Sequence, residues 1–253
     1  MNNMKTVNII PVPHLSTFAG GLPIISRTGS EYNISGFFSF IPTNEYEMQQ
    51  WIVEAFNREN LVADGPQIVA VNANSSNPHY APTAEVSAKI GEGDFVLLDL
   101  WAKKNWPNAV YYDISWTGYV GDAVPERIQN IFEIVQRSRD AGISKVQETV
   151  AAGLKLCGWE VDKVSRDVIE QAGYGAYFNN RTGHSIGTEV HGNGANMDNF
   201  EVRDEREVIA NTCFSIEPGI YLPEFGLRSE VDVLVREGSA EVTGRIQQNV
   251  LLL

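Results

Sequence analysis

The sequence has few of the residues that disulfide-bonded or membrane-spanning folds require. Only 2 cysteines occur, Cys157 and Cys213, and they form no Cys-x-x-Cys pair, which excludes a disulfide framework and a thiolate zinc site. No apolar run is long enough to span a membrane. Prolines interrupt the short apolar stretch near the N-terminus, so we expect no secretory signal. These features fit a cytoplasmic protein with reduced thiols.

Positive charge is also scarce, because 19 Lys and Arg residues face 32 Asp and Glu residues, which gives a net charge of -13. A chain this acidic has no electrostatic reason to bind nucleic acid or an anionic membrane, and we expect neither as a partner. Solvated acidic faces explain most of such an excess. A carboxylate cluster neutralised by a bound cation explains a further part.

Several well-known catalytic motifs are absent. The sequence contains no G-x-x-x-x-G-K-[ST] phosphate loop, no G-x-G-x-x-G, no G-x-S-x-G elbow and no H-E-x-x-H. Phosphate-loop, dinucleotide, serine-hydrolase and zincin chemistry therefore have no support in the sequence.

The hydrophobic pattern predicts an α+β fold. Residues 1–42 carry scattered prolines and glycines and predict an irregular N-terminal segment, whereas residues 43–253 predict a single domain. A 3.6-residue apolar period predicts a helix from Asn44 to near Asn60, capped by Thr43. Further elements follow from period and punctuation: strands at 67–71, 94–101 and 109–116, helices within 125–156 and 161–171, and strands at 185–191, 212–217, 227–235 and 241–243.

Four carboxylates stand inside apolar strand-like runs: Asp99, Asp113, Glu217 and Glu230. A single such residue is usually at a strand end or facing solvent. Four in separate strands would repel one another unless protons or a cation neutralised them. Divalent cations favour oxygen-rich sites, so these residues are candidate metal ligands.

The chain has only 4 histidines, of which His184 and His191 lie close together in the sequence. A continuous strand would place them on opposite faces, because their spacing is odd, whereas a bend at Gly187 would allow them to meet. Each alone is more often a structural group than a ligand. Both arrangements stay open from the residues alone.

Five motifs occur in the order found in the M24 metallopeptidases, the family of methionine aminopeptidase, aminopeptidase P and prolidase. The resemblance covers roughly residues 43–243 and rests on Phe95-Val-Leu-Leu-Asp-Leu, Tyr112-Asp-Ile-Ser-Trp-Thr, Arg181-Thr-Gly-His-Ser-Ile-Gly, Ser215-Ile-Glu-Pro-Gly-Ile-Tyr and Leu227-Arg-Ser-Glu. It implies the pita-bread fold, with a mixed, largely antiparallel sheet and flanking helices. It also implies that residues 43–253 are a metallopeptidase catalytic domain.

The resemblance implies a dinuclear metal site with five ligands: Asp99, Asp113, His184, Glu217 and Glu230. Ligation dominated by oxygen with one imidazole favours two Mn²⁺ ions, with Co²⁺, Fe²⁺ and Zn²⁺ as alternatives. A bridging hydroxide would attack the scissile carbonyl while Glu217 moves the proton. By the same resemblance His79 and His191 are catalytic and substrate-facing donors, and Arg228 contacts substrate.

The position of Arg228 and the run Arg181-Thr-Gly-His are similar to prolidase, which implies exopeptidase cleavage of an Xaa-Pro bond in small peptides. Methionine aminopeptidase-like activity is one alternative, and an inactive or truncated pita-bread domain that binds peptides or proteins is another. Asn180 stands where prolidase-like members usually have histidine.

Related enzymes carry a further N-terminal domain and dimerise through it. We therefore expect a single-domain member, a partial product of a longer gene, or an altered version, and leave a homodimer open.

Overall fold

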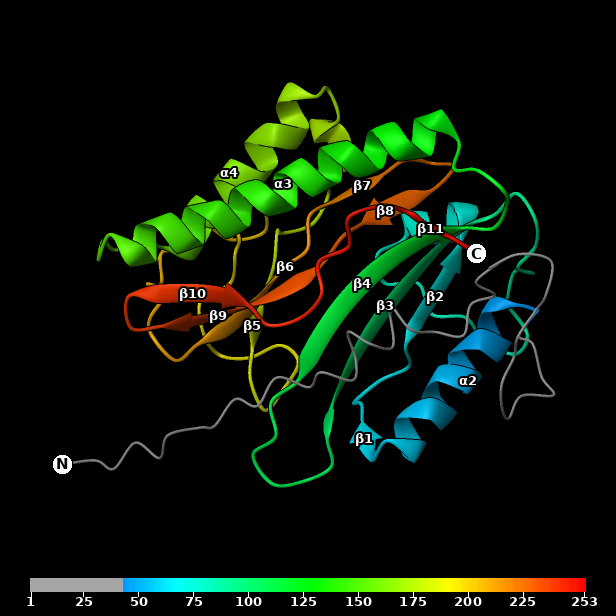
Figure 1. Ribbon diagram of the computed structural model, residues 1–253, viewed down its shortest axis with the longest axis horizontal. Coiled ribbons are helices and arrows are strands. Elements are labelled where there is room, and N and C mark those ends of the chain that lie inside the picture. Colours follow the sequence, from blue (N-terminus) through cyan, green and yellow to red (C-terminus); the bar gives the residue numbers. More distant parts are fainter. Residues whose placement is uncertain (1–42) are drawn as a thin grey trace.

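The structure is a computed structural model that describes residues 43–253 (Figure 1). The predicted irregular segment, residues 1–42, lies outside the described residues. The helices are α2 (Glu45–Arg58), α3 (Glu126–Ala151) and α4 (Gly158–Gln171), with short 3-10 turns η1 (Asn72–Ser76) and η2 (Gly175–Tyr177). The strands are β1 (Leu61–Val62), β2 (Ile68–Val71), β3 (Phe95–Lys104), β4 (Tyr112–Tyr119), β5 (Ser185–Ile186), β6 (Cys213–Ile216), β7 (Gly219–Tyr221), β8 (Gly226–Arg228), β9 (Val231–Arg236), β10 (Ser239–Val242) and β11 (Leu251–Leu252).

Helix α2 begins one residue later than predicted. Asn44, not Thr43, is its N-cap, and the Asn44 Oδ1 atom accepts a hydrogen bond from the Glu47 amide at 2.9 Å. Thr43 instead donates from both its amide and its hydroxyl to Glu47 Oε2, at 2.8 and 2.9 Å. An asparagine oxygen serves as well as a hydroxyl at this position. The predicted helix is therefore confirmed, but its N-cap lies one residue later than predicted.

The strands form two larger sheets. The first has the order β1-β3-β4-β11, with β2 also paired to β3, and the second has the order β10-β9-β6-β5. Strands β7 and β8 form a separate hairpin. Strands β3 and β4 pair antiparallel, with Asp99 opposite Ser115 and Trp101 opposite Asp113. This pairing confirms the two strands predicted at 94–101 and 109–116, with their bounds shifted to Phe95–Lys104 and Tyr112–Tyr119.

Alternation along β3 and β4 separates two packed faces. Leu98 and Leu100 on β3, with Ile114 on β4, pack against α2. The other face of β3 carries Phe95 and Leu97, which pack with α3. Asp99 and Asp113 alternate with the α2-facing residues, so the strand period turns both carboxylates away from α2 and into the body of the domain.

Helix α3 runs over both sheets (Figure 1) and contacts β10 of the second sheet. Its Ile128 and Phe132 side chains belong to the same core cluster as Phe95 of the first sheet. Pro125 directly precedes the helix, as a proline at a helix start should. The helix stops at Ala151, before the Leu156 limit predicted from the sequence, because Gly153 adopts a φ of 67°. Its buried side chains join the two sheets into one core.

Two predicted strands are shorter or broken. The strand expected over 185–191 spans only Ser185–Ile186, and the strand expected over 227–235 divides into β8 and β9. At the second break, the amide of Ser229 donates to Pro218 O at 3.4 Å and the amide of Glu230 to Ser115 O at 3.3 Å. The main chain leaves the pairing of β8 and enters that of β9 at this point, which a simple alternation pattern cannot show.

Among residues 43–253, no helix combines the length and apolar character that a membrane span requires.

Candidate metal centre

The predicted ligands meet where the two sheets adjoin. Asp99 and Asp113 come from β3 and β4 of the first sheet. Glu217 and Glu230 directly follow β6 and precede β9 of the second sheet, and His184 directly precedes β5. The structure therefore brings residues from both halves of the chain to one junction.

Asp113, His184 and Glu230 form the tightest part of the cluster. All three are buried, and each offers a ligand atom within 4.8 Å of those of the other two. His184 Nε2 lies 3.4 Å from Asp113 Oδ2. Asp113 Oδ1 and Glu230 Oε1 are buried without a hydrogen-bond partner in the part of the chain that the structure describes. Buried carboxylate oxygens without donors are costly, and a divalent cation would satisfy both, so this donor set fits a metal ion.

Glu217 joins the cluster through His184 and Ser215. Its Oε1 atom lies 3.4 Å from His184 Nε2 and accepts a hydrogen bond from Ser215 Oγ at 3.1 Å. Ser215 Oγ in turn accepts from the His184 amide at 3.0 Å. One hydroxyl therefore fixes the main chain of one predicted ligand and the side chain of another.

Arg228 and Ser115 connect Asp99 to the remaining carboxylates. Arg228 Nη2 donates to Asp99 Oδ2 at 2.5 Å, and its Nε donates to Ser115 Oγ at 2.8 Å. Ser115 Oγ lies 3.0 Å from Asp99 Oδ1 and 2.7 Å from Glu230 Oε2. A hydroxyl has a single proton, so Ser115 can donate to only one of these oxygens at a time. The second oxygen is free to accept from another group.

Burial raises the pKa of three carboxyl groups at the junction: Asp99, Glu230 and Asp232. Burial raises the pKa of Asp99 to about 7, and the charge of Asp113 adds to this while Arg228 opposes it. Burial, followed by the charge of Asp113, raises the pKa of Glu230 well above its ordinary value. The same two causes raise the pKa of Asp232. Ionising these carboxyl groups together is therefore unfavourable unless a cation is bound.

The pKa values of the two histidines shift in opposite directions. Burial lowers the pKa of His184, but the hydrogen bond to Asp113 and the charge of Glu217 outweigh it and hold this pKa at about 9. Burial and the neighbouring positive charge of His184 lower the pKa of His191. Metal binding requires a neutral imidazole and ionised carboxylates, so a cation would displace these protons.

His184 and His191 meet, as the bend alternative allowed. Their ring centroids lie 4.4 Å apart in an edge-on arrangement. Strand β5 ends at Ile186, and the chain turns back so that the Gly192 amide donates to Ser185 O at 2.6 Å. The opposite-face arrangement expected of a continuous strand is therefore wrong. His191 itself is exposed.

His79 stands apart from the cluster. It is exposed in the loop after η1, where its amide donates to Asn77 Oδ1 at 3.0 Å. Across residues 43–253, no hydrogen bond, ion pair or ring contact joins its side chain to the five predicted ligands. Its catalytic role stays a prediction. Arg228 is buried and donates to protein groups, including Tyr221 OH at 3.1 Å, so its predicted contact with substrate is also untested.

Two features at the junction were not predicted. Asp232 is buried beside the cluster, and its Oδ2 atom accepts from the Asp113 amide at 3.0 Å. The i, i+2 spacing of Glu230 and Asp232 in the strand predicted at 227–235 was a signal for it, because such a spacing places two side chains on one face of a strand. Asp162 and Arg166 on α4 form a pair at 2.9 Å that holds the segment before His184: Arg166 donates to the main-chain oxygens of Phe178 and Asn180, at 2.9 and 2.8 Å. Helical spacing alone did not indicate that role.

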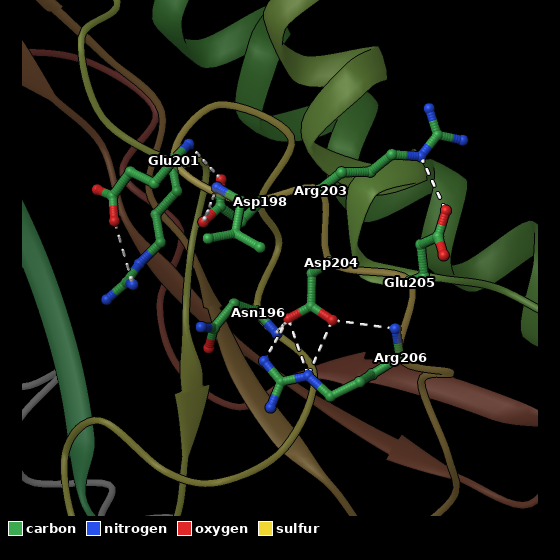
Figure 2. Close-up of a pocket in the computed structure, with 9 residues that line it drawn as sticks. Asn196, Asp198, Glu201, Arg203, Asp204, Glu205 and Arg206 are labelled. Atoms are coloured by element: carbon green, nitrogen blue, oxygen red, sulfur yellow. Dashed lines mark hydrogen bonds and ion pairs between the residues drawn. The ribbon is translucent and has the colours of Figure 1, made fainter.

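A separate cavity of about 580 Å³ lies beside the loop that follows this segment (Figure 2). Its charged lining is paired internally: Arg206 binds both carboxylate oxygens of Asp204, and Arg203 lies 3.3 Å from Glu205. None of the predicted site residues lines it. The metal centre is therefore distinct from this cavity.

Comparison with known proteins assigns the family. Residues 35–237 match the sequence profile of Metallopeptidase family M24. An Xaa-Pro dipeptidase from Lactobacillus delbrueckii subsp. lactis is 34% identical over 173 residues, which are 68% of this chain and 42% of that protein. A dipeptidase structure from Pyrococcus horikoshii OT3 has a TM-score of 0.71 at 30% identity, covering 85% of this chain and 56% of that one.

An X-Pro aminopeptidase structure from Thermotoga maritima MSB8 has a TM-score of 0.70 at 25% identity, covering 84% of this chain and 56% of that one. The chain spans about half the length of the curated relatives it matches. These similarities confirm the predicted pita-bread fold and the family resemblance. The chain belongs to metallopeptidase family M24.

Proposed function

We propose that this chain is the catalytic part of a metal-dependent exopeptidase that cleaves the peptide bond between an N-terminal residue and a following proline. The buried group of Asp113, His184 and Glu230, with ligand atoms within 4.8 Å of one another, carries the proposal. Family membership supports the hydrolytic class. The Xaa-Pro dipeptidase and X-Pro aminopeptidase named above support the substrate class.

Two divalent ions, most favourably Mn²⁺, would be held by five side chains: Asp99, Asp113, His184, Glu217 and Glu230. Carboxylate oxygens with a single imidazole suit Mn²⁺, Co²⁺ or Fe²⁺, and Zn²⁺ is a further alternative. When bound, such ions supply Lewis acidity and lower the pKa of a coordinated water. Arg228 and Ser115 hold the oxygens of Asp99 before any ion binds, at 2.5 and 3.0 Å.

The protein groups would move the proton and bind the developing charge. Glu217 would accept a proton from the attacking nucleophile at a carboxylate oxygen and donate it to the leaving nitrogen. Ser215 Oγ orients Glu217 Oε1 at 3.1 Å, and the Glu217 side chain keeps 13% exposure, which leaves it reachable from solvent. His191, exposed beyond His184, would donate a hydrogen bond to the oxygen of the carbonyl under attack.

Small peptides are the proposed partners. The net charge of -13 disfavours nucleic acid and anionic membranes. A cytoplasmic location is proposed from the cysteines, since Cys157 and Cys213 are both free thiols. A homodimer and a substrate contact by His79 belong to the same proposal, on the family resemblance alone.

Hydrolysis of three matched peptides tests the proposal. Chelator-stripped protein would be assayed with and without Mn²⁺ on an Xaa-Pro dipeptide, an Xaa-Pro-Yaa tripeptide and Met-Ala-Ser. Metal-dependent release of the first residue from a proline peptide is expected. Cleavage of Met-Ala-Ser alone would instead indicate methionine aminopeptidase-like activity. No turnover of any peptide by folded, metal-loaded protein would contradict the proposed activity.

A further inference from the structure

Arg139 is a buried cation on α3 that the predicted ligand set does not explain. Its side chain has a relative exposure of 0%, whereas its carboxylate partner Asp140, at 2.8 Å, is 52% exposed. Burying a guanidinium is costly unless its donors are satisfied inside the protein. The other bonds of Arg139 go to Ser229, next to the predicted ligand Glu230 in the chain, and to Gln247.

The first of these partners is Ser229. Arg139 Nη1 donates to Ser229 Oγ at 2.6 Å. Ser229 is fully buried and stands between Arg228 and Glu230, at the break between β8 and β9. A hydroxyl fixed here holds the main chain that carries a predicted ligand on one side and the partner of Asp99 on the other.

The second partner is Gln247, whose main-chain oxygen accepts from Arg139 Nη1 at 2.8 Å. Both the carbonyl and the amino group of the Gln247 side chain then form hydrogen bonds with β4. Its Oε1 atom accepts from the Thr117 amide at 3.0 Å, and its Nε2 atom donates to Thr117 O at 2.6 Å. Thr117 lies on the same strand as Asp113, so a continuous chain of hydrogen bonds runs from Ser229 through Arg139 and Gln247 to β4.

This chain of bonds crosses the junction of the two sheets. Asp113 belongs to the first sheet and Glu230 adjoins the second, and no ladder pairs β4 with β9. The main-chain bond across the gap, from the Glu230 amide to Ser115 O, is long at 3.3 Å. Two side-chain contacts also cross directly, from Ser115 Oγ to Glu230 Oε2 at 2.7 Å and from the Asp113 amide to Asp232 Oδ2 at 3.0 Å. Side chains therefore contribute strongly to the separation of the two carboxylates, and the bonds of Arg139 support it from α3.

We propose that Arg139 is a positioning residue that fixes the separation of the Asp113 and Glu230 carboxylates, through Ser229 and Gln247, and so sets the metal affinity of the centre. This inference rests on the proposed function, since it takes the cluster to be a metal site. Replacing a residue that orients metal ligands through hydrogen bonds typically changes metal affinity by about 10- to 100-fold. Arg139 acts in this way although it contacts none of the ligand atoms.

The test measures the dissociation constant for Mn²⁺ by calorimetry, together with the free energy of unfolding in chelator. Arg139→Gln removes the charge and most donors, and it should weaken Mn²⁺ binding by about tenfold or more. Arg139→Lys keeps the charge and can reach one acceptor, so it should recover part of that loss. Ser229→Ala removes only one acceptor and should weaken binding more mildly, which keeps the test decisive if Arg139→Gln does not fold.

The matched control is Ile128→Ala, which also removes a buried side chain from α3, three turns earlier in the helix. It should lower stability while changing the Mn²⁺ dissociation constant by no more than about twofold. Equal Mn²⁺ affinities for folded Arg139→Gln, Ser229→Ala and wild type would overturn the positioning role while leaving the peptidase proposal intact. A folded wild-type protein that binds no metal would overturn both.

Discussion

Arg228 and Asp99 are held together across the junction of the sheets, with Arg228 Nη2 donating to Asp99 Oδ2 at 2.5 Å. The pair keeps one predicted metal ligand in a fixed orientation without any bound ion. Both side chains are almost buried, at 3% and 13% exposure. Arg228 therefore supplies one of the positive charges that offset the carboxylate cluster, beside the imidazole of His184.

Replacing Arg228 by Met should lower the free energy of unfolding of the metal-free protein by about 3 kcal/mol or more, because it leaves a buried charge without its partner. Urea denaturation in chelator measures this. Arg236→Met is the control, since its pair with Glu241 is exposed at 51% and 55% and should contribute less than about 1 kcal/mol. Equal losses in the two variants would show that the buried pair is not stabilising.

Asp113→Ala should abolish metal retention and lower the hydrolysis rate by more than about a hundredfold, because it removes a member of the buried group that Asp113 forms with His184 and Glu230. Metal content after dialysis and peptide release would be measured together. Asp167→Ala removes an exposed carboxylate on α4, paired with Lys163, and should leave both quantities unchanged. Near-normal turnover in Asp113→Ala would contradict its place in the metal centre.

His191→Ala should lower kcat by about a hundredfold and change KM little, since its hydrogen bond is expected to strengthen only as charge develops on the substrate oxygen. Steady-state kinetics on an Xaa-Pro peptide would separate the two constants. His191→Gln retains a donor and should recover part of kcat. A raised KM at unchanged kcat would assign His191 to simple substrate binding.

The metal-free protein should lose stability as pH rises. The folded protein holds protons on Asp99, with a pKa of about 7, and on His184, with a pKa of about 9, that the unfolded chain releases at lower pH. A group whose pKa is raised by folding stabilises the folded protein fully at a pH below its pKa in the unfolded chain. This stabilisation is lost as the pH rises through the pKa of the group in the folded protein. Unfolding curves between about pH 5 and pH 9 should therefore show falling stability in chelator.

Mn²⁺ should reverse this trend, since it binds the deprotonated cluster, and its binding at neutral pH should release protons. Calorimetry in buffers of different ionisation enthalpy would count the released protons. A metal-free protein whose stability stays constant or rises over the same pH range would contradict the assigned protonation.

Arg166→Ala should lower the free energy of unfolding by about 3 kcal/mol, because it breaks the pair with fully buried Asp162 and releases the segment before His184. The Thr182 amide also donates to Asp162, at 2.9 Å, so the whole segment is affected. Lys163→Ala on the same helix removes an exposed pair and should cost less than about 0.5 kcal/mol. Chemical denaturation distinguishes the two, and similar losses would argue against an anchoring role.

Much of the centre was predictable because carboxylates in apolar strands are unfavourable. Asp99, Asp113, Glu217 and Glu230 each stood in such a run, and strand alternation turned the first two away from α2. The order of five motifs then identified the family. Local patterns were sufficient here because each ligand belongs to a strand or directly adjoins one.

The remaining features depend on where the chain bends and on distant partners. The meeting of His184 and His191 requires a turn after Ile186, which the alternating pattern concealed. Arg139 falls within the helices predicted over 125–156, and no motif around it marked it out. Its role emerges only when Ser229 and Gln247, about a hundred positions later, arrive beside it. Periodicity carries no information about such contacts.

The metal dependence of the proposed hydrolysis is tested by a titration of Mn²⁺ into chelator-stripped protein while hydrolysis of an Xaa-Pro peptide is followed. We expect no hydrolysis without metal, activity that rises with Mn²⁺ and saturates near two ions per chain, and no such rise in Asp113→Ala. Hydrolysis that is unaffected by removing and restoring the metal, or a folded wild-type protein that binds Mn²⁺ without cleaving the peptide, would contradict the proposed function.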